Sequence, residues 1–268
     1  MNKERISVIM ACYNGERFII EQMDSIRKQT LQPDEVIICD DCSSDETVKM
    51  INKYIKNYHL NTWKLIINEK NIGWMKNFHQ LLKETNGEII FFSDQDDIWK
   101  TNKIEIMVNE MKKNNKIKVL SSKADFINSI GNKINVSKKS LPFGKIEKKR
   151  LKKNKLNNKF IYSIFPGCTM AIRAEAIKSY NSFDFNNIPH DALYWKMGTL
   201  NEQAYTLNLP LISYRIHNSN ASSPLTNSVP HIKTSNDRIK EITSNTTIII
   251  LAAALAGAKY SIDNNTKD

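Results

Sequence analysis

Several features are scarce in this 268-residue chain, and each absence excludes a class of protein. It has four cysteines, eight glycines, and no apolar run longer than residues 248–258. Four cysteines at this length indicate reduced thiols rather than a disulfide scaffold. A helix that spans a membrane needs about 20 apolar residues, more than this run supplies. The first residues also lack the basic start, apolar centre and cleavage site of a signal peptide. We therefore expect a cytoplasmic protein.

Familiar nucleotide and metal motifs are also missing. The chain has neither the glycine-rich phosphate loop of NTPases nor the G-x-G-x-x-G fingerprint of nicotinamide enzymes. Cys39 and Cys42 have zinc-like spacing, but a zinc site needs two further ligands and none lies nearby. A sugar nucleotidyltransferase should carry a glycine-rich basic loop after its first strand, where this chain has ACYNGER. That class is disfavoured and stays an alternative.

Basic residues are in excess, with 39 Lys and Arg against 28 Asp and Glu, for a net charge of +11. Such an excess favours an anionic partner: nucleotide phosphates, nucleic acid or an acidic lipid surface. Residues 145–159 hold many of the basic side chains, either as a solvated loop or as a contact for anionic lipid or substrate. No aromatic residues are interleaved with them, so we expect no nucleic-acid binding.

The first hundred residues predict an α/β fold. Nearly continuous apolar runs at 6–12, 36–39 and 89–92, with a weaker one at 65–67, read as strands buried on both faces. Amphipathic helical patterns at 16–28, 45–57 and 74–84 separate them. This alternation predicts a mostly parallel central sheet flanked by helices and built from right-handed crossovers.

The rest of the chain is less regular. We expect helices at 104–111, from 174 and at 189–196, strands at 118–121, after 161 and at 211–216, and a tight turn at 166–167. Residues 218–240 have the composition of a linker, and 241–262 predict an apolar helix. We therefore predict a domain over 1–222, with a nucleotide-binding half at 1–100 and an acceptor half at 101–222, followed by a linker and C-terminal helix at 223–268. This helix either packs on protein or contacts a membrane.

Acidic residues follow the predicted strands. Asp40 and Asp41 come after one strand, and Asp94, Asp96 and Asp97 after another. In an open parallel sheet these positions share one crevice, where two carboxylates 4 Å apart would repel by about 4 kcal/mol at an effective dielectric of about 20. A divalent cation or a donor-rich ligand would relieve this repulsion, and oxygen donors favour Mg²⁺ or Mn²⁺. Such a metal in a basic protein in turn suggests a diphosphate ligand. The alternative for the second cluster is a cap on the following helix.

Four segments, SVIMACYNGERFI, DEVIICDDCSSDET, NIGWMKNF and IIFFSDQDDIW, resemble the successive blocks of glycosyltransferase family 2. Two later ones, HDALYW and YRIHNSNAS, are similar to the rhamnosyltransferase-like branch of that family. The resemblance covers about residues 4–220. It implies the GT-A fold of nucleotide-diphospho-sugar transferases, a helical C-terminal tail beyond it, inverting chemistry, and a Mn²⁺ or Mg²⁺ cofactor.

The resemblance also implies roles for individual residues. Those implied to bind the donor nucleotide are Ala11, Tyr13, Asp40 or Asp41, Asn71, Gly73, Lys76, Asp94 and Gln95. Those implied to hold the metal are Asp94, Asp96 and His217, with Asp97 able to share the task. Those implied to line the acceptor and sugar pocket are Trp99, Gly167, Cys168, Thr169 and His190. Asp191 is implied to be the catalytic base, which takes the proton of the acceptor hydroxyl. Helix capping is a structural alternative for Asp191, strand-end packing for Tyr13, and ordinary hydrogen bonding for His217.

These expectations combine into one predicted reaction. The chain would move rhamnose or a hexose from a dTDP- or UDP-sugar to a hydroxyl of a bacterial surface-polysaccharide precursor. The acceptor would be a glycan on a lipid diphosphate, which places the protein in the cytoplasm or at the inner face of the plasma membrane. The alternatives are an inactive glycan- or nucleotide-binding relative and a sugar nucleotidyltransferase. The sequence leaves the donor, linkage and oligomeric state open.

Overall fold

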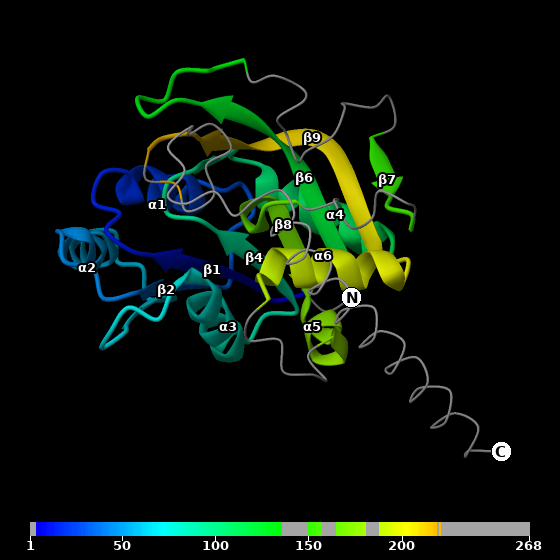
Figure 1. Cartoon of the computed structure of the whole chain (residues 1–268), viewed down its shortest axis with the longest axis horizontal. Coiled ribbons are helices and arrows are strands. Elements are labelled where there is room, and N and C mark those ends of the chain that lie inside the picture. The colour runs from blue at the N-terminus through cyan, green and yellow to red at the C-terminus, as the bar shows by residue number, and fades with distance from the viewer. Residues whose placement is uncertain (1–3, 136–149, 157–164, 181–187, 219, 221–268) are drawn as a thin grey trace, which may run out of the picture.

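The computed structural model describes residues 4–135, 150–156, 165–180, 188–218 and 220, and one sheet of nine strands runs through them (Figure 1). The elements of the first half are β1 (Ile6–Cys12), α1 (Ile19–Arg27), β2 (Glu35–Asp40), α2 (Thr47–Asn57), β3 (Trp63–Ile67), α3 (Trp74–Glu84) and β4 (Ile89–Ser93). Those that follow are β5 (Ile98–Trp99), α4 (Lys103–Lys113), β6 (Val119–Ile127), β7 (Leu151–Lys153), the 3₁₀ turn η2 (Gly167–Thr169), β8 (Met170–Arg173), α5 (Ala174–Tyr180), α6 (His190–Leu200) and β9 (Ala204–Arg215).

The first four strands are parallel, as the sequence predicts, in the order β3-β2-β1-β4. Each right-handed crossover puts its helix on a face set by the direction of travel along the sheet. The chain moves outward from β1 to β3 and then returns to β4, so α1 and α2 cover one face and α3 the other (Figure 1). The carboxyl ends of β1, β2 and β4 therefore meet at one edge.

The second half adds antiparallel strands. β8 pairs antiparallel with β4 and with β6, while β6 runs parallel to β9 and the two-residue β5 pairs antiparallel with β9. The expectation of a mostly parallel sheet therefore describes the first half, and the sheet as a whole is mixed. Because one sheet continues through both predicted halves, they share a core.

Two segments differ from their sequence prediction. The strand expected at 211–216 is the end of the twelve-residue β9. The first part of β9 contains polar residues and Pro210, so its sequence does not show the apolar pattern of a strand. Pro210 pairs with Lys123 where the β6–β9 register shifts, which is where a strand tolerates proline. Within the basic segment 145–159, Leu151–Lys153 forms β7 against β9 rather than a loop. The predicted linker and helix beyond residue 220 lie outside the described residues, as do 161–164.

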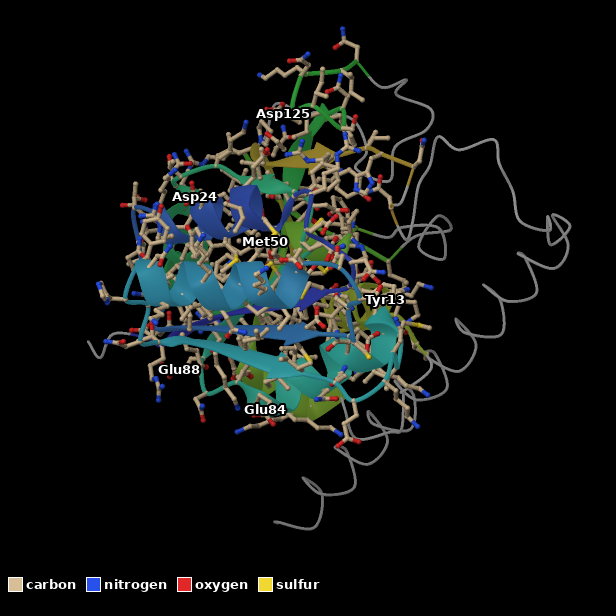
Figure 2. The ribbon with its side chains drawn as sticks, turned by 90° about the vertical axis from the view of Figure 1, so that its left-hand side faces the viewer. Tyr13, Asp24, Met50, Glu84, Glu88 and Asp125 are labelled. Carbon is tan, nitrogen blue, oxygen red and sulfur yellow. The ribbon has the colours of Figure 1, made fainter. Side chains whose placement is uncertain are left out.

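The sheet is buried between its helices. β1 and β4 are almost wholly inaccessible, and Ile19, Met23 and Ile26 bury one face of α1. Figure 2 looks onto α2; Tyr13, which follows β1, lies on the opposite side of the molecule from Glu88, which precedes β4. None of the helices in the described part of the chain has the length and apolar character to cross a bilayer.

Candidate active site

A cavity of about 340 Å³ opens at the carboxyl ends of the parallel strands. Its walls come from the ends of β1 and β4, the loops after β2 and β3, the start of α3, the turn at Gly167, the start of α6, and residues around the end of β9. The predicted site residues that line it are Ala11, Tyr13, Asp41, Asn71, Gly73, Asp94, Gln95, Asp96, Gly167, His190 and Asp191. The chain thus brings most of the expected donor residues into one cavity with the expected base.

Several of the expected site residues do not line this cavity. Asp40 is fully buried and its carboxylate accepts hydrogen bonds from the backbone and hydroxyl of Ser43, so it stabilises the turn after β2. Lys76 is exposed on α3. Cys168 and Thr169 are buried behind the turn at Gly167.

Trp99 was expected beside the acceptor and lies in the core. Its side chain is 2% exposed, packs on Phe91 with ring centroids 5.9 Å apart, and has the Lys103 ammonium 3.9 Å above its ring. Trp99 pairs with Ile212 of β9 and does not line the cavity.

Asp41 shapes the cavity wall at the end of β2. One carboxylate oxygen accepts hydrogen bonds from the Asn68 side chain and the Ile72 N–H at 2.9 Å, and the other accepts the Gly73 N–H at 2.8 Å. Gly73 has φ 84°, in the left-handed region that favours glycine, and α3 starts directly after it. The loop between β3 and α3 is therefore folded around one carboxylate, and this fixes where α3 begins.

Tyr13 and Gln95 join the ends of β1 and β4. The Tyr13 N–H donates to the Gln95 side-chain oxygen at 2.9 Å, and the Gln95 amide donates to the Tyr13 carbonyl at 3.0 Å. A side chain at Gly15 would collide with Gln95, since its Cβ would lie 2.3 Å from that oxygen. The Tyr13 ring itself is 46% exposed at the cavity, so a planar ligand can reach it.

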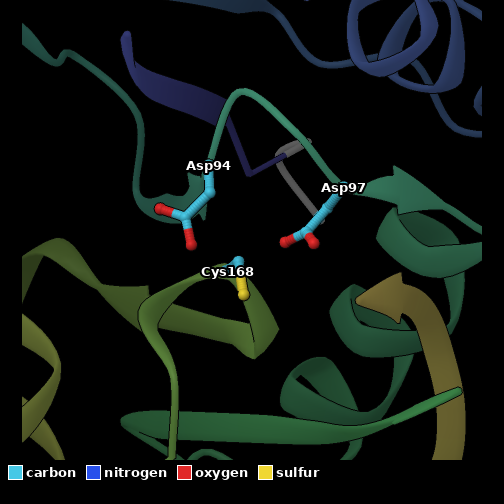
Figure 3. A group of neighbouring side chains, drawn as sticks. All are labelled: Asp94, Asp97 and Cys168. Carbon is cyan, nitrogen blue, oxygen red and sulfur yellow. The ribbon is translucent and has the colours of Figure 1, made fainter. Parts of the chain in front are cut away.

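Asp94, Asp97 and Cys168 form a cluster whose polar atoms all lie within 4.8 Å of one another (Figure 3). Burial, and then repulsion from Asp96, raises the pKa of Asp94 to about 7. Burial and the charges of Asp96 and Asp94 also raise the pKa of Asp97 well above its ordinary value. The cluster therefore has less positive charge around it than its carboxylates need.

Asp96 meets His217 and Asn220. Its carboxylate is 2.8 Å from the His217 Nε2 and 3.1 Å from the Asn220 amide nitrogen, which donates to it. Asn220 in turn accepts the His217 backbone N–H at 2.6 Å. His217 thus makes the ordinary hydrogen bond that was its structural alternative, and its metal role stays a prediction. Asp96 and Asn220 line the cavity and His217 does not. Asn220 is a site residue that the sequence analysis missed.

Arg215 is a second missed residue, and it holds the acidic loop from behind. It is 1% exposed; its Nε donates to the Asp96 carbonyl at 2.7 Å and its backbone N–H to the Asp97 carboxylate at 2.9 Å. Its guanidinium also pairs with Glu21 and lies 4.7 Å from the Phe18 ring centroid. Arg215 therefore fixes the loop of Asp96 and Asp97 against α1.

These acidic residues fit a divalent cation. Asp94 and Asp96 face the cavity, and Oδ2 of Asp97 is buried with no hydrogen-bond partner among the described residues. Carboxylate oxygens suit Mg²⁺ and Mn²⁺. The Cys168 thiol does not, because sulfur is a soft ligand and these are hard cations. Asp94 and Asp97 offer carboxylate oxygens within 4.8 Å of each other, and Asp96 faces the cavity beside them. The expected ligand set of Asp94, Asp96 and His217 stays a prediction, since His217 does not line the cavity.

Asp191 stands across the cavity, in the first turn of α6. Its carboxylate accepts the Ala192 N–H at 2.7 Å and is also hydrogen-bonded by the backbone of Gly167. Burial raises its pKa to about 6 against these stabilising bonds. It is therefore ionised above that pH and can accept a proton from a hydroxyl.

His190, beside it, is neutral. Burial, then the charge of His79, lowers the pKa of its ring to about 3. The ring stacks on Phe92 at 4.7 Å and packs on Phe78 at 4.1 Å. A Cβ on Gly167 would lie 2.3 Å from the His190 Nε2, so glycine is required there for the ring to fit.

The raised pKa of Asp191 predicts the pH dependence of activity. A general base must be ionised, so with Asp191 in the expected role kcat/KM should rise with pH through an apparent pKa near 6 and level off above it. An unperturbed aspartate would place that limb near 4. A pH–rate profile from about pH 4.5 to 8.5 measures it, and the same profile for Asp125→Asn should be unchanged, since Asp125 pairs with Lys100 on the surface. A limb near 4 in the wild type contradicts this assignment.

Comparison with known proteins agrees with this fold and cavity. The sequence model described as glycosyl transferase family 2 matches residues 7–180. The dTDP-rhamnosyl transferase RfbG of Shigella flexneri is 31% identical over 225 residues, 79% of this chain and 72% of RfbG. The glucosyltransferase WfgD of Escherichia coli, named for UDP-Glc and GlcNAc-diphosphoundecaprenol, is 36% identical over 115 residues, 43% of this chain; the chain spans only 44% of WfgD.

Among solved structures, Staphylococcus aureus TarS 1–349 in complex with UDP has a TM-score of 0.67 at 22% identity, over 92% of this chain and 65% of that one. GalNAc-T7 with UDP, GalNAc and Mn²⁺ has a TM-score of 0.61 at 17% identity, over 83% of this chain and 46% of that one. These likenesses confirm the predicted GT-A fold. The match over residues 7–180 and the 31% identity with RfbG show that the chain belongs to glycosyltransferase family 2.

Proposed function

We propose that this chain transfers a sugar, rhamnose or a hexose, from a dTDP- or UDP-sugar to a hydroxyl of a bacterial surface-polysaccharide precursor, with inversion at the anomeric carbon. One observation carries the proposal: Asp191, on α6, lines the same cavity as Asp94 and Asp96, on the loop after β4. One wall carries a candidate base, and the other carries an acidic loop that lacks neighbouring positive charge and could bind a cation. This arrangement suits displacement of a nucleoside diphosphate.

The step follows from this arrangement. The acceptor hydroxyl enters beside Asp191, which takes its proton as the oxygen forms a bond to the anomeric carbon. The bond from that carbon to the diphosphate breaks, and its electron pair leaves with the nucleoside diphosphate. Asp94, Asp96 and His217 would hold a divalent ion there, which supplies the positive charge that the departing diphosphate requires. No separate acid for the leaving group is needed.

The donor side is supported by Tyr13, Asp41 and the loop that Asp41 folds. Tyr13 and Asp41 line the cavity at the ends of β1 and β2, where the aromatic ring and the carboxylate can meet a pyrimidine base. TarS binds UDP and UDP-GlcNAc, and RfbG is named for dTDP-rhamnose. Both nucleotides carry a pyrimidine, so we propose a pyrimidine nucleotide donor.

We further propose a lipid diphosphate as the acceptor's carrier, which places the enzyme at the cytoplasmic face of the plasma membrane. WfgD is named for such an acceptor, and the net charge of +11 suits an anionic one. The domain over 1–222, with its linker and helix at 223–268, belongs to the same proposal.

A nucleotide and transfer panel tests the proposal. Thermal unfolding with UDP, dTDP, GDP and CMP, each with Mn²⁺ or with a chelator, should show a shift for UDP or dTDP only, and only with the metal. A ligand at about a hundred times its Kd stabilises by about 2.7 kcal/mol, which is a shift of several degrees.

The second arm measures transfer from dTDP-rhamnose, UDP-glucose and UDP-GlcNAc to a synthetic GlcNAc α-diphosphate with an undecyl chain. Methyl α-GlcNAc is the control without a carrier, and it should be the poorer acceptor. Equal use of both glycosides would contradict the lipid carrier. Absence of both a shift and transfer across the panel would contradict the function itself.

A further inference from the structure

Trp74 is the exposed member of the four tryptophans, and it lies on the cavity wall. Its side chain is 41% exposed, whereas Trp63, Trp99 and Trp195 are exposed by 9% or less. An exposed aromatic ring on the wall of a cavity is positioned to contact a ligand through its face, because pockets are lined largely by apolar and aromatic side chains. Within the described part of the chain, the packing around Trp74 leaves its side chain accessible.

The backbone fixes where this ring stands. Asp41 binds the Gly73 N–H, and Gly73 adopts its positive φ as the N-cap of α3, so Trp74 is the first residue of that helix. Phe78 follows four residues later and shares its face of the helix. Both rings contact His190: Phe78 packs on it at 4.1 Å, and Trp74 meets it edge-on, with centroids 6.1 Å apart and planes at 76°.

Trp74 lies between the two sides of the cavity: it follows Gly73 of the loop that Asp41 folds, and its ring contacts His190. His190 directly precedes Asp191, the proposed base, at the start of α6. The nucleotide-side aromatic, Tyr13, comes from the end of β1 and is tied to Gln95 instead. The cavity thus has two exposed aromatic side chains, Tyr13 and Trp74.

We propose that Trp74 is the platform on which the acceptor sugar packs. A hexopyranose ring presents one face rich in C–H groups and hydroxyls around its rim. The indole takes the apolar face, since aromatic side chains give a large and rigid contact area at little entropic cost. The hydroxyls then remain free, and the one to be glycosylated can point toward Asp191. This inference rests on the proposed function and adds the residue that orients its acceptor.

Kinetics of Trp74→Ala and Trp74→Phe test the platform, with the donor and GlcNAc diphosphate pair that the wild type uses. We expect the acceptor KM to rise roughly tenfold in Trp74→Ala and less in Trp74→Phe, which keeps part of the ring. Donor KM, and hydrolysis of the donor without acceptor, should stay within about twofold. Tyr58→Ala is the matched control, because Tyr58 is 47% exposed at the end of α2 and does not line the cavity.

Fluorescence gives a second readout. Acrylamide should quench mainly Trp74 in the wild type, and the GlcNAc diphosphate should protect it while UDP or dTDP alone does not. A donor KM that rises with the acceptor KM, or protection by nucleotide alone, would make Trp74 a nucleotide contact and overturn the inference. An unchanged acceptor KM would overturn it as well. Failure of the proposed function shows separately, as a wild type that transfers nothing.

Discussion

Asp191→Asn should lower kcat roughly a thousandfold and leave nucleotide binding unchanged. A positioned general base contributes about 10²- to 10⁴-fold, and the amide cannot accept the acceptor's proton. Asparagine keeps the shape of the side chain and can still accept the Ala192 N–H, so the start of α6 should hold. The measurement is single-turnover transfer, with the UDP or dTDP thermal shift recorded on the same sample.

The stability of this variant separates lost chemistry from misfolding. Burial raises the pKa of Asp191 in the folded state, so the folded chain binds this proton more tightly than the unfolded chain does. Its contribution is therefore most favourable at low pH and is lost as the pH rises through about 6. Removing the charge should leave Tm at about pH 7.5 no lower than that of the wild type. Undiminished transfer by Asp191→Asn would instead favour a different base. If the protein were an inactive binding relative, neither variant would transfer sugar and the substitution would leave ligand binding unchanged.

The parallel half of the fold could be predicted because its signals are local. Each strand is a short apolar run, each helix has one apolar face, and the acidic residues follow directly in the chain. The choice between Asp40 and Asp41 was harder, since it depends on side-chain direction at the strand end. The Asp40 carboxylate binds Ser43, whereas Asp41, which points to the other side of the strand, lines the cavity.

The missed residues depend on contacts between distant parts of the chain. Arg215 acts on Asp96 and Asp97 from 119 and 118 positions away, and nothing around it in the sequence indicates that partner. Trp74 lies within an amphipathic helix, where an aromatic residue is typical of the core. Trp99 is wrongly placed for the opposite reason: it adjoins the acidic motif in sequence, but in the fold its side chain is buried against Phe91 and Lys103.

The acidic loop supports the other large prediction: Asp96→Asn should abolish the metal-dependent nucleotide shift. Asp96 faces the cavity, carries the His217 contact and raises the pKa of Asp94 through its charge. Even partners one shell removed from a metal change its affinity about 10- to 100-fold, so loss of a direct oxygen ligand should weaken Mn²⁺-dependent UDP or dTDP binding at least about a hundredfold. Calorimetric titration of nucleotide with Mn²⁺ and with a chelator measures this.

Asp96→Asn should not unfold the protein, so a loss of nucleotide binding in this variant can be assigned to the loss of the carboxylate. The new side-chain amide can still bond with His217, and removing one negative charge relieves the repulsion that disfavours ionised Asp94 and Asp97. The unliganded variant should therefore melt no lower than the wild type at about pH 7.5. Full nucleotide binding by Asp96→Asn would show that the acidic loop serves the fold and not the donor.

Arg215→Lys should give a milder loss of nucleotide binding than Asp96→Asn does. The backbone N–H to the Asp97 carboxylate persists in this variant, while the Nε bond to the Asp96 carbonyl is lost, so the loop is held less firmly but keeps its ligands. The same calorimetric titration measures the loss. Arg173→Lys is the matched control, since Arg173 is also buried but pairs with Glu4, away from the cavity. If both variants weakened binding equally, general destabilisation would explain the effect, and Arg215 would have no particular part in holding the acidic loop for the donor.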